Sequence, residues 1–379
     1  MHRRYLKARP DWQEKVEKLG LVYHTTDGKP YWNESACYVF TAREVDEIEA
    51  ATNTLHGLCL QAAEHVIYAN RYAEIGIPPQ AVDAIRWSWE AEPPSLYGRF
   101  DLAYDGSGPP KMLEYNADTP TALLEAAVIQ WYWKEEVDPG ADQFNSLWEA
   151  LVAKWRELKD GRYLAGDPVH FGHARSAEDL MTVSLLRDTA QEAGVATEGI
   201  HMTDIGWNSE RNSFVDLQER PIRTIFKLYP WEWMLSEPFA VQALRTYPHV
   251  QWIEPIWKML LSSKGILAIL WEMFPNHPNL LAAYLGRSRE LTRYVKKPLF
   301  SREGANIMLK DGGSLVRSDG PYDDPHSVFQ DLGPVPDIGG NRPVIGSWVI
   351  DGVAHGMGIR ESDGPITDNL SRFAPHVFR

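Results

Sequence analysis

Residues 99–121 read RFDLAYDGSGPPKMLEYNADTPT, and the interpretation of the whole chain starts from this stretch. Two short runs with the alternation of β-strands flank a turn dense in Gly and Pro, which predicts a β-hairpin. If Tyr104 pairs with Lys111, the hairpin places Arg99 opposite Asn116. Two polar side chains of opposite strands then meet on one face of the sheet.

The same register places Asp101 directly opposite Glu114. Two carboxylates that face each other across a pair of strands repel and destabilise the ladder. A divalent cation is the simplest way to offset that repulsion. Oxygen atoms of Asp, Glu and Asn are the ligands that Mg²⁺ prefers, so we expect Asp101, Glu114 and Asn116 to hold a metal ion.

The hairpin runs directly into a predicted helix, because residues 122–133 (ALLEAAVIQWYW) are predominantly apolar with helical spacing. Thr119 suits the N-cap position and Pro120 the first helical position. The N-terminus of a helix offers free N–H groups to an anion. An acidic metal site beside such a helix suits a substrate that carries phosphate or carboxylate. The alternative is a polar sheet edge followed by a capped helix.

The composition is that of a folded protein of two or three lobes, with 379 residues, 44% hydrophobic and 11% aromatic. The net charge of −14 argues against nucleic acid or an anionic membrane as the main partner. Cys37 and Cys59 form no disulfide framework or metal-binding spacing, which favours a reducing, cytoplasmic setting. The basic N-terminus lacks the apolar core of a signal peptide, and no apolar run is long enough to cross a membrane.

Three regions are expected along the chain. Residues 1–165 combine a helical region with the hairpin 99–121, and a long helix after Thr41 is its clearest element. Residues 166–225 alternate strand, helix and strand, which predicts a parallel β-α-β lobe. Residues 226–379 are expected to alternate helix and strand, with strands in 290–310 and a hairpin in 342–362.

Basic residues punctuate apolar segments of the last region. Lys264 interrupts a run that reads as helix, Lys297 ends a predicted strand, and Arg360 follows Gly358 in another. A lysine among apolar residues needs a partner, and a polyphosphate is one candidate while a nearby carboxylate is another. The chain contains no GxxxxGK[ST], GxGxxG, GxSxG, HExxH or CxxC motif, which leaves P-loop, Rossmann, hydrolase and zinc sites without support.

Taken together, the motifs resemble the synthetase part of the glutathionylspermidine synthase family, in its short bacterial members without the amidase domain. The motifs that carry this resemblance are SLYGRFDLAYDG, EYNADTPT, FKLYPWEWM, WKMLLSSK, YVKKPLFSREGAN and IGSWVIDGVAHGMGIRES with NLSRFAPH, in this order. The resemblance covers about Pro10 to Phe378. It implies a mixed α+β and α/β protein with a permuted ATP-grasp fold and an associated β-α-β lobe of the pre-ATP-grasp type. Residues 226–379 would then form the ATP-grasp lobes, two small α+β lobes that hold the nucleotide between them.

The resemblance also implies an enzyme that uses ATP and Mg²⁺ to join a carboxylate and an amine through an acyl-phosphate. Arg99 is then the catalytic residue, beside the metal ligands Asp101, Glu114 and Asn116. The remaining positions that match the family are those of nucleotide binding, Lys264, Lys297, Arg302, Gly304, Asn306, Gln330, Leu332 and Arg360, and those of substrate binding, Thr119 and Thr121.

The expected partners are small molecules: a carboxylate donor such as glutathione or another peptide, and an amine acceptor such as a polyamine. Hydrolysis of the product is not expected, because no segment matches an amidase domain. Two alternatives stay open. One is a nucleotide-binding ATP-grasp module without ligase activity, which would not need Arg99, and the other is a phosphotransferase on the same fold.

Overall fold

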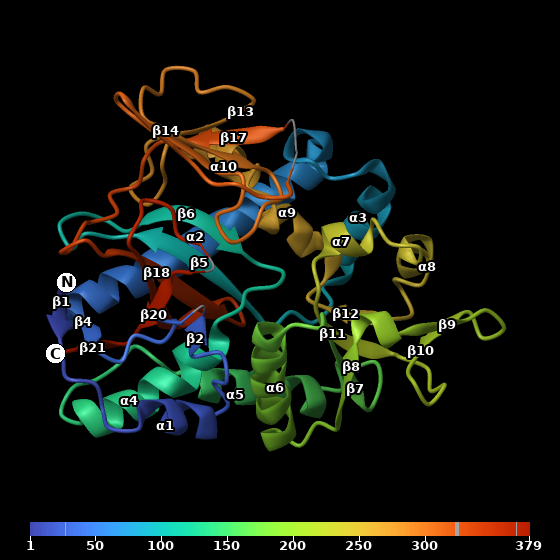
Figure 1. The fold of residues 1–379 in the computed structure, drawn as a ribbon. Coiled ribbons are helices and arrows are strands. Elements are labelled where there is room, and N and C mark those ends of the chain that lie inside the picture. The colour runs from blue at the N-terminus through green and yellow to red at the C-terminus, as the bar shows by residue number, and fades with distance from the viewer. Residues whose placement is uncertain (27, 323–325, 369) are drawn as a thin grey trace.

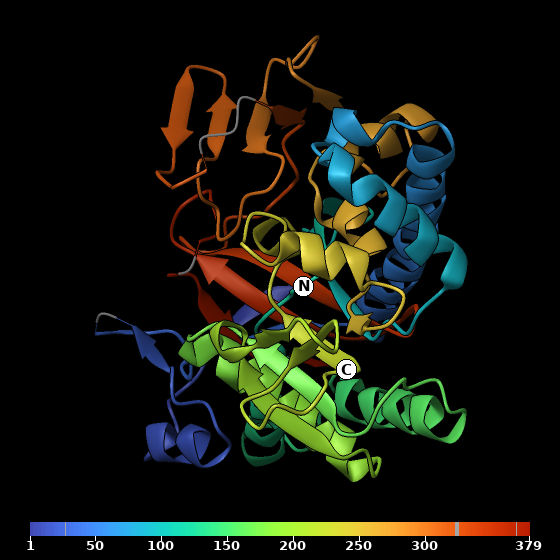
Figure 2. The ribbon, with the colours of Figure 1, turned by 90° about the vertical axis from the view of Figure 1, so that its right-hand side faces the viewer.

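The computed structural model describes residues 1–26, 28–322, 326–368 and 370–379. The hairpin around which the site is built is present, as β5 (Tyr97–Ala103) and β6 (Lys111–Asn116). It forms one edge of an antiparallel five-stranded sheet in the order β20-β19-β18-β5-β6, which lies in the middle of the molecule in Figures 1 and 2. The other strands of this sheet are β18 (Arg342–Ile350), β19 (Val353–Ser362) and β20 (Arg372–Ala374). The hairpin predicted in 342–362 is thereby confirmed.

The register of the β5–β6 hairpin confirms the predicted facing pairs and corrects the predicted closing pair. Asp101 lies opposite Glu114, as the alternation of polar residues requires. Lys111, however, pairs with Ala103 and not with Tyr104. Leu113 has no partner in β5, so the hairpin contains a β-bulge that absorbs one residue between the turn and the carboxylates.

The strand, helix and strand predicted within residues 166–225 are present, and the two strands are parallel. Their parallel sheet has the order β12-β11-β7-β8, and it lies beside the central sheet together with helix α6 (Ala177–Glu192) (Figure 1). The strands are β7 (Val169–His173), β8 (Thr197–His201), β11 (Thr224–Leu228) and β12 (Gln251–Ile253). Strands β7 and β11 are buried throughout, as the inner strands of a parallel sheet are.

A second antiparallel sheet of five strands caps the molecule above the central sheet (Figures 1 and 2). Its order is β13-β17-β14-β15-β16, and it includes the two strands predicted in 290–310. Its strands are β13 (Ala283–Leu285), β14 (Tyr294–Pro298), β15 (Met308–Asp311), β16 (Ser314–Arg317) and β17 (Ser327–Gln330). Lys297 therefore lies in β14, as predicted.

The longest helix, α2 (Ala42–Tyr68), packs against β18 and β19. It begins at the predicted Thr41 N-cap, whose hydroxyl accepts a bond from the Glu44 amide, while the Glu44 carboxylate accepts from the Thr41 amide. The other helices are α1 (Trp12–Lys18), α3 (Val82–Ala91), α4 (Gln130–Val137), α5 (Leu147–Asp160), α7 (Trp231–Met234), α8 (Ala240–Arg245), α9 (Met259–Ser262) and α10 (Ile266–Met273).

Two predicted helical features are wrong. Lys264 does not lie inside a helix, because α9 ends at Ser262 and α10 begins at Ile266. A side chain at Gly265 would come within 2.9 Å of the Ile75 backbone, so the chain turns where these two segments approach each other closely.

The helix after the hairpin also starts later than predicted. Thr119 and Pro120 belong to neither a helix nor a strand, and the helix begins at Leu123 after Ala122, which has a left-handed backbone conformation with φ +65°. Its first turns are a π-helical segment, Glu125–Ile129, which continues into α4. Thr119 is therefore not an N-cap. The proposed anion site at the first turn of a helix has no support here, because residues 119–122 form no helical turn.

The chain ends close to where it starts. A third sheet joins β1 (His2–Tyr5), β4 (Ala36–Phe40) and β21 (His376–Phe378), so the N and C labels lie together in Figure 1. Two further ribbons complete the strands: β2 (Thr25–Thr26) with β3 (Lys29–Pro30), and β9 (Gly206–Asn208) with β10 (Ser213–Val215). Within the part of the chain that the structure describes, no helix is long and apolar enough to span a bilayer.

Candidate active site

A cavity of about 620 Å³ opens where the central sheet, the parallel sheet and the upper sheet meet. It is lined by residues from β5, β6, β14, β15, the start of α6 and the end of β11. Twelve of the predicted site residues line it: Arg99, Asp101, Glu114, Asn116, Thr119, Thr121, Lys297, Arg302, Gly304, Gln330, Leu332 and Arg360. Lys264 and Asn306 do not line the cavity, and each contacts a residue or segment that does.

The facing carboxylates on β5 and β6 are each paired with a cation. Asp101 Oδ1 lies 2.8 Å from Arg99 Nε, and Glu114 Oε2 lies 3.1 Å from Lys264 Nζ. The repulsion that the sequence predicts is therefore already offset by protein side chains, and a metal ion is not needed to explain the pairing. Burial tends to raise the pKa of Glu114, but the charges of Lys264 and Lys297 outweigh it and lower this pKa to about 2.

Lys297 is buried between the bulge of β6 and the end of β17. Its Nζ donates to the Leu113 carbonyl and to Gln330 Oε1, each at 2.8 Å. Because Leu113 has no partner in β5, the bulge leaves its carbonyl free to accept this bond. Burial lowers the pKa of Lys297 to about 8, against the attraction of Glu114. An ammonium group with a few hydrogen bonds and little water around it suits a bound anion.

The oxygen atoms that line the floor of the cavity fit a magnesium ion that is completed by a ligand. Among the described residues there is no group of three or more His, Cys, Asp or Glu side chains that could hold a metal alone. Asp101 and Glu114 supply two carboxylates, and the Asn116 amide donates to Glu114 Oε1 at 3.1 Å, which directs its oxygen away from that carboxylate. Mg²⁺ is commonly held by one or two carboxylates together with substrate phosphates.

Arg99 projects from β5, the strand next to the edge strand β6, and is 8% exposed. Besides Asp101, it donates from Nη1 to the Thr121 carbonyl at 2.6 Å, and its guanidinium lies 5.6 Å from the ring centre of Trp348. These contacts fix the plane of the guanidinium in the cavity wall. A planar cation held in this way is suited to bind a phosphate with two parallel hydrogen bonds.

Arg302 bridges the cavity. Its Nη1 donates to Thr119 Oγ1 at 2.7 Å and its Nη2 to Glu232 Oε1 at 2.6 Å, while the guanidinium lies 5.6 Å from the Trp233 ring centre. The hydroxyl of Thr119, which the sequence analysis assigned to a helix cap, is thus engaged by an arginine from a distant segment. This contact explains why Thr119 faces the cavity.

The turn 302–306 is tied to its surroundings by backbone contacts. Gly304 has φ +68°, and a side chain there would come within 2.4 Å of the Thr367 carbonyl. Asn306 Oδ1 accepts from the Tyr322 amide at 2.9 Å, so Asn306 stabilises the turn from outside the cavity. Arg360 lines the cavity and donates to the Asp368 carbonyl.

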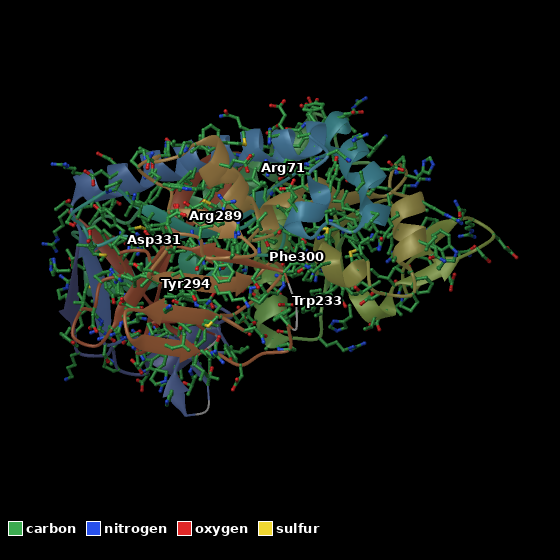
Figure 3. All side chains as sticks on the ribbon, turned by 90° about the horizontal axis from the view of Figure 1, so that it is seen from above. Arg71, Trp233, Arg289, Tyr294, Phe300 and Asp331 are labelled. Atoms are coloured by element: carbon green, nitrogen blue, oxygen red, sulfur yellow. The ribbon has the colours of Figure 1, made fainter. Side chains whose placement is uncertain are left out.

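Two parts of the cavity were not predicted. The first is an apolar wall at the upper sheet. It consists of the predicted Leu332 and of four further residues, Leu113, Val295, Leu309 and Val335. The alternation of β14, with Val295 and Lys297 on one face, carried the signal for this wall. Asp331 and Trp233, which both line the cavity, are labelled well apart in Figure 3.

The second missed part is an acidic wall at the start of α6, formed by Glu178 and Asp179 with Glu303 from the turn. Burial, reinforced by the charge of Glu178, raises the pKa of Asp179 to about 7. Burial also raises the pKa of Glu303. The Ser176 N-cap with two acidic residues after a strand was visible in the sequence, but nothing local shows that this helix start faces β5.

Comparisons with known proteins show the family of the chain. The family model of the glutathionylspermidine synthase preATP-grasp matches residues 3–379. A putative acid–amine ligase of Haemophilus influenzae is 41% identical over 388 residues, with 98% of each chain covered. Trypanothione synthetase of Crithidia fasciculata is 29% identical, over 84% of this chain and 53% of its own length.

The bifunctional glutathionylspermidine synthetase/amidase of Escherichia coli is 25% identical, over 97% of this chain and 63% of its own. The chain thus spans between half and two thirds of the length of these two synthetases. A glutathione synthetase-like effector from Globodera pallida has a similar mixed α/β fold, with a TM-score of 0.60 and 10% identity over 99% of this chain and 100% of that one.

These relatives confirm the enzyme class expected from the motifs, an ATP-dependent ligase that joins an acid to an amine. They also confirm the resemblance on which that expectation rests, since the family match covers nearly the whole chain. The chain belongs to the glutathionylspermidine synthase preATP-grasp family.

Proposed function

We propose that this cavity binds Mg-ATP and activates a carboxylate as an acyl-phosphate, which an amine then converts to an amide. The observation that carries the proposal is that Arg99, Lys297 and Arg302 line the same cavity as the two carboxylates and the amide of Asp101, Glu114 and Asn116. Three cations around a carboxylate pair suit a polyphosphate with its metal ion better than either alone. We also propose that the upper sheet and the central sheet form a permuted ATP-grasp.

Within this proposal the nucleotide lies between the two antiparallel sheets. The apolar wall receives the adenine ring, with Gln330 and Leu332 at its edge, and Lys297, Arg302 and Gly304 surround the phosphates. Lys264 and Asn306 support this arrangement from outside the cavity, through Glu114 and the Tyr322 amide. Asp101, Glu114 and Asn116 hold Mg²⁺, which neutralises phosphate charge when bound.

The reaction then takes two steps. A carboxylate oxygen of the donor attacks the γ-phosphorus of ATP, the bond from phosphorus to the β,γ-bridging oxygen breaks, and ADP leaves. The amine nitrogen of the acceptor attacks the acyl carbon, the carbon–oxygen bond breaks, and inorganic phosphate leaves with the amine having lost a proton. Arg99 stabilises the charge that develops on the transferring phosphoryl group.

Two groups of residues in the cavity, which differ in charge, support an acid and an amine as the substrates. Thr119, Thr121 and Arg360 offer hydroxyl, backbone and cationic groups to a peptide-like donor such as glutathione. Glu178, Asp179 and Glu303 offer negative charge to an amine acceptor such as a polyamine. With its pKa near 7, Asp179 is able to accept the proton that the amine loses.

A screen for ADP release tests the proposal. Small carboxylates and peptides are crossed with amines in the presence of Mg-ATP, with glutathione and spermidine as the first pair. Amine-dependent ADP release and an amide product are expected. ADP with a stable phosphorylated product and no need for an amine would indicate a phosphotransferase, and nucleotide binding without any turnover would indicate a binding module.

A further inference from the structure

The segment 226–234, FKLYPWEWM, has no role in the mechanism above, and yet it contacts two of the elements that form the cavity. It comprises the end of β11 and the start of α7. Two of its charged side chains, Lys227 and Glu232, point away from the parallel sheet to partners on other elements. Their contacts converge on the two arginines of the proposed reaction.

Lys227 is fully buried and forms an ion pair with Asp118, which is 1% exposed. The distance from Lys227 Nζ to Asp118 Oδ1 is 2.5 Å, and the other carboxylate oxygen accepts from the Trp231 amide at 3.0 Å. Burying two charges costs several kcal/mol per ion, so such a pair is weak support for stability in itself. What it does provide is a defined position for Asp118 relative to β11.

Asp118 directly precedes the segment 119–122, which contacts Arg302 and Arg99. The Thr119 hydroxyl accepts from Arg302, and the Thr121 carbonyl accepts from Arg99. The Pro120 carbonyl between them accepts from Tyr97 at 3.1 Å. Residues 119–122 form no helical turn, so this short stretch depends on such contacts for its position.

Glu232 holds the same arginine from the other side. Its Oε1 accepts from Arg302 Nη2 at 2.6 Å, while Thr119 accepts from Nη1. Its Oε2 is buried and has no hydrogen-bond partner among the residues that the structure describes, so the ion pair with Arg302 is the principal contact of this carboxylate there. The segment 226–234 therefore positions Arg302 in two ways. Glu232 contacts it directly, and Lys227 acts on it indirectly through Asp118.

We infer that Lys227 and Glu232 are positioning residues, which place Arg302 and Arg99 for phosphoryl transfer without contacting substrate. The inference rests on the proposed function only in saying that the placement of the two arginines serves phosphoryl transfer. The placement itself is a property of the protein alone. Lys227 acts through Asp118 on both arginines, and Glu232 acts on Arg302 only.

The test measures how fast phenylglyoxal modifies each arginine, followed peptide by peptide with mass spectrometry. In Glu232→Gln, Arg302 is expected to react at least threefold faster while Arg99 is unchanged. In the double variant Lys227→Met with Asp118→Asn, which leaves no buried charge unpaired, both arginines are expected to react at least threefold faster. Unchanged rates at Arg302 in Glu232→Gln, or at both arginines in the double variant, overturn the inference.

Two references separate positioning from general loosening. Arg3 is 5% exposed at its side chain and is held by Glu361, and neither residue lines the cavity, so its rate must stay constant. Glu198→Gln removes an exposed ion-pair partner of Arg220 in the same lobe and is expected to change neither Arg99 nor Arg302. A rise at Arg3 together with the other two would mean that the pair is structural. If the double variant does not fold, Glu232→Gln decides alone.

Turnover supplies the second readout, with any acid–amine pair that the wild-type protein converts. Both variants are expected to lose at least tenfold in kcat, while KM for ATP changes less than threefold. In an Arg302→Gln background, Glu232→Gln should cause no further loss, because it acts through that arginine. An additive further loss contradicts the inference. If the wild type converts no pair, the proposed function fails, and the modification rates still decide the placement.

Discussion

Arg99 and Asp101 lie two residues apart on the same strand and form an ion pair of 2.8 Å that faces the cavity. The proposed catalytic cation and a proposed metal ligand therefore share one contact. A ligand that binds one of these two side chains changes the electrostatic environment of the other. The consequences differ for the two residues, which makes their roles separable by substitution.

Replacing Arg99 should affect turnover more than binding. Arg99→Ala is expected to lower kcat about 10³-fold or more, because a cation that stabilises transferring phosphoryl charge acts mainly in the transition state. The dissociation constant of Mg-ATP should change little, as measured by calorimetry. Arg99→Lys is the matched variant: it keeps the charge, loses the planar fork, and should remain well below the wild type. A fully active Arg99→Ala would remove the assigned role.

Replacing Asp101 should affect binding first. Asp101→Asn keeps the shape of the side chain but removes a metal-binding charge, so the affinity for Mg-ATP is expected to fall. The melting temperature without ligand should change little, because Asp101 lies at the cavity surface and Arg99 keeps its bond to the Thr121 carbonyl. Asp105→Asn, in the exposed hairpin turn, is a control of equal charge change. An unchanged nucleotide affinity in Asp101→Asn would contradict metal binding at this residue.

The affinity for ATP should depend on pH through Lys297. Its pKa of about 8 lies below the ordinary 10.5, so the ammonium is charged below pH 8 and becomes neutral as the pH rises through that value. Phosphate affinity of the free protein is therefore expected to decline from pH 7 to pH 9. Calorimetry across this range measures the effect. Lys297→Met should bind weakly at every pH and lose this part of the pH dependence.

Mg-ATP should stabilise the folded protein. At a hundredfold excess over the dissociation constant, a ligand that binds only the native state adds about 2.7 kcal/mol to the free energy of unfolding. A rise of the melting temperature that depends on both ATP and Mg²⁺ is expected. A protein whose melting temperature responds to neither would not be a nucleotide-binding protein.

The acidic wall should govern the acceptor. Asp179→Asn is expected to raise KM for the amine without changing KM for ATP, because the residue lines the cavity from α6 and is not part of the apolar wall proposed for adenine. It should also stabilise the protein at pH 8: the raised pKa means that the native wild type binds a proton more tightly than the unfolded chain, so its stability falls as pH rises from about 4 through 7. Equal amine KM values in the two proteins would contradict the assignment.

The residues of the site were predictable where the signal was local and periodic. Asp101 and Glu114 face each other because alternation along two strands determines which side chains share a face. The bulge at Leu113 was not predictable, since its free carbonyl is matched to Lys297 in another sheet. Thr119 was wrongly predicted as a helix cap. Its hydroxyl accepts a hydrogen bond from Arg302, which is distant in the sequence, and no local pattern reveals that contact.

The parts of the fold that alternate strand and helix were predicted correctly, including the parallel β7–β8 pair. The break at Lys264 was missed because an apolar run reads as continuous helix until a tertiary contact interrupts it, here that of Gly265 with Ile75. The acidic wall was missed although its residues were visible, because the sequence does not say which loops meet across a cavity. The division into regions ending at 165 and 225 stays a prediction.

The place of the hairpin in the central sheet has a consequence for biosynthesis. Strand β5 pairs with β18, so Phe100 cannot find its partner Ser347 until β18 has left the ribosome. Contacts between such distant segments form slowly. A nascent chain that stops before β18 therefore carries Arg99 and Asp101 without the completed floor of the cavity.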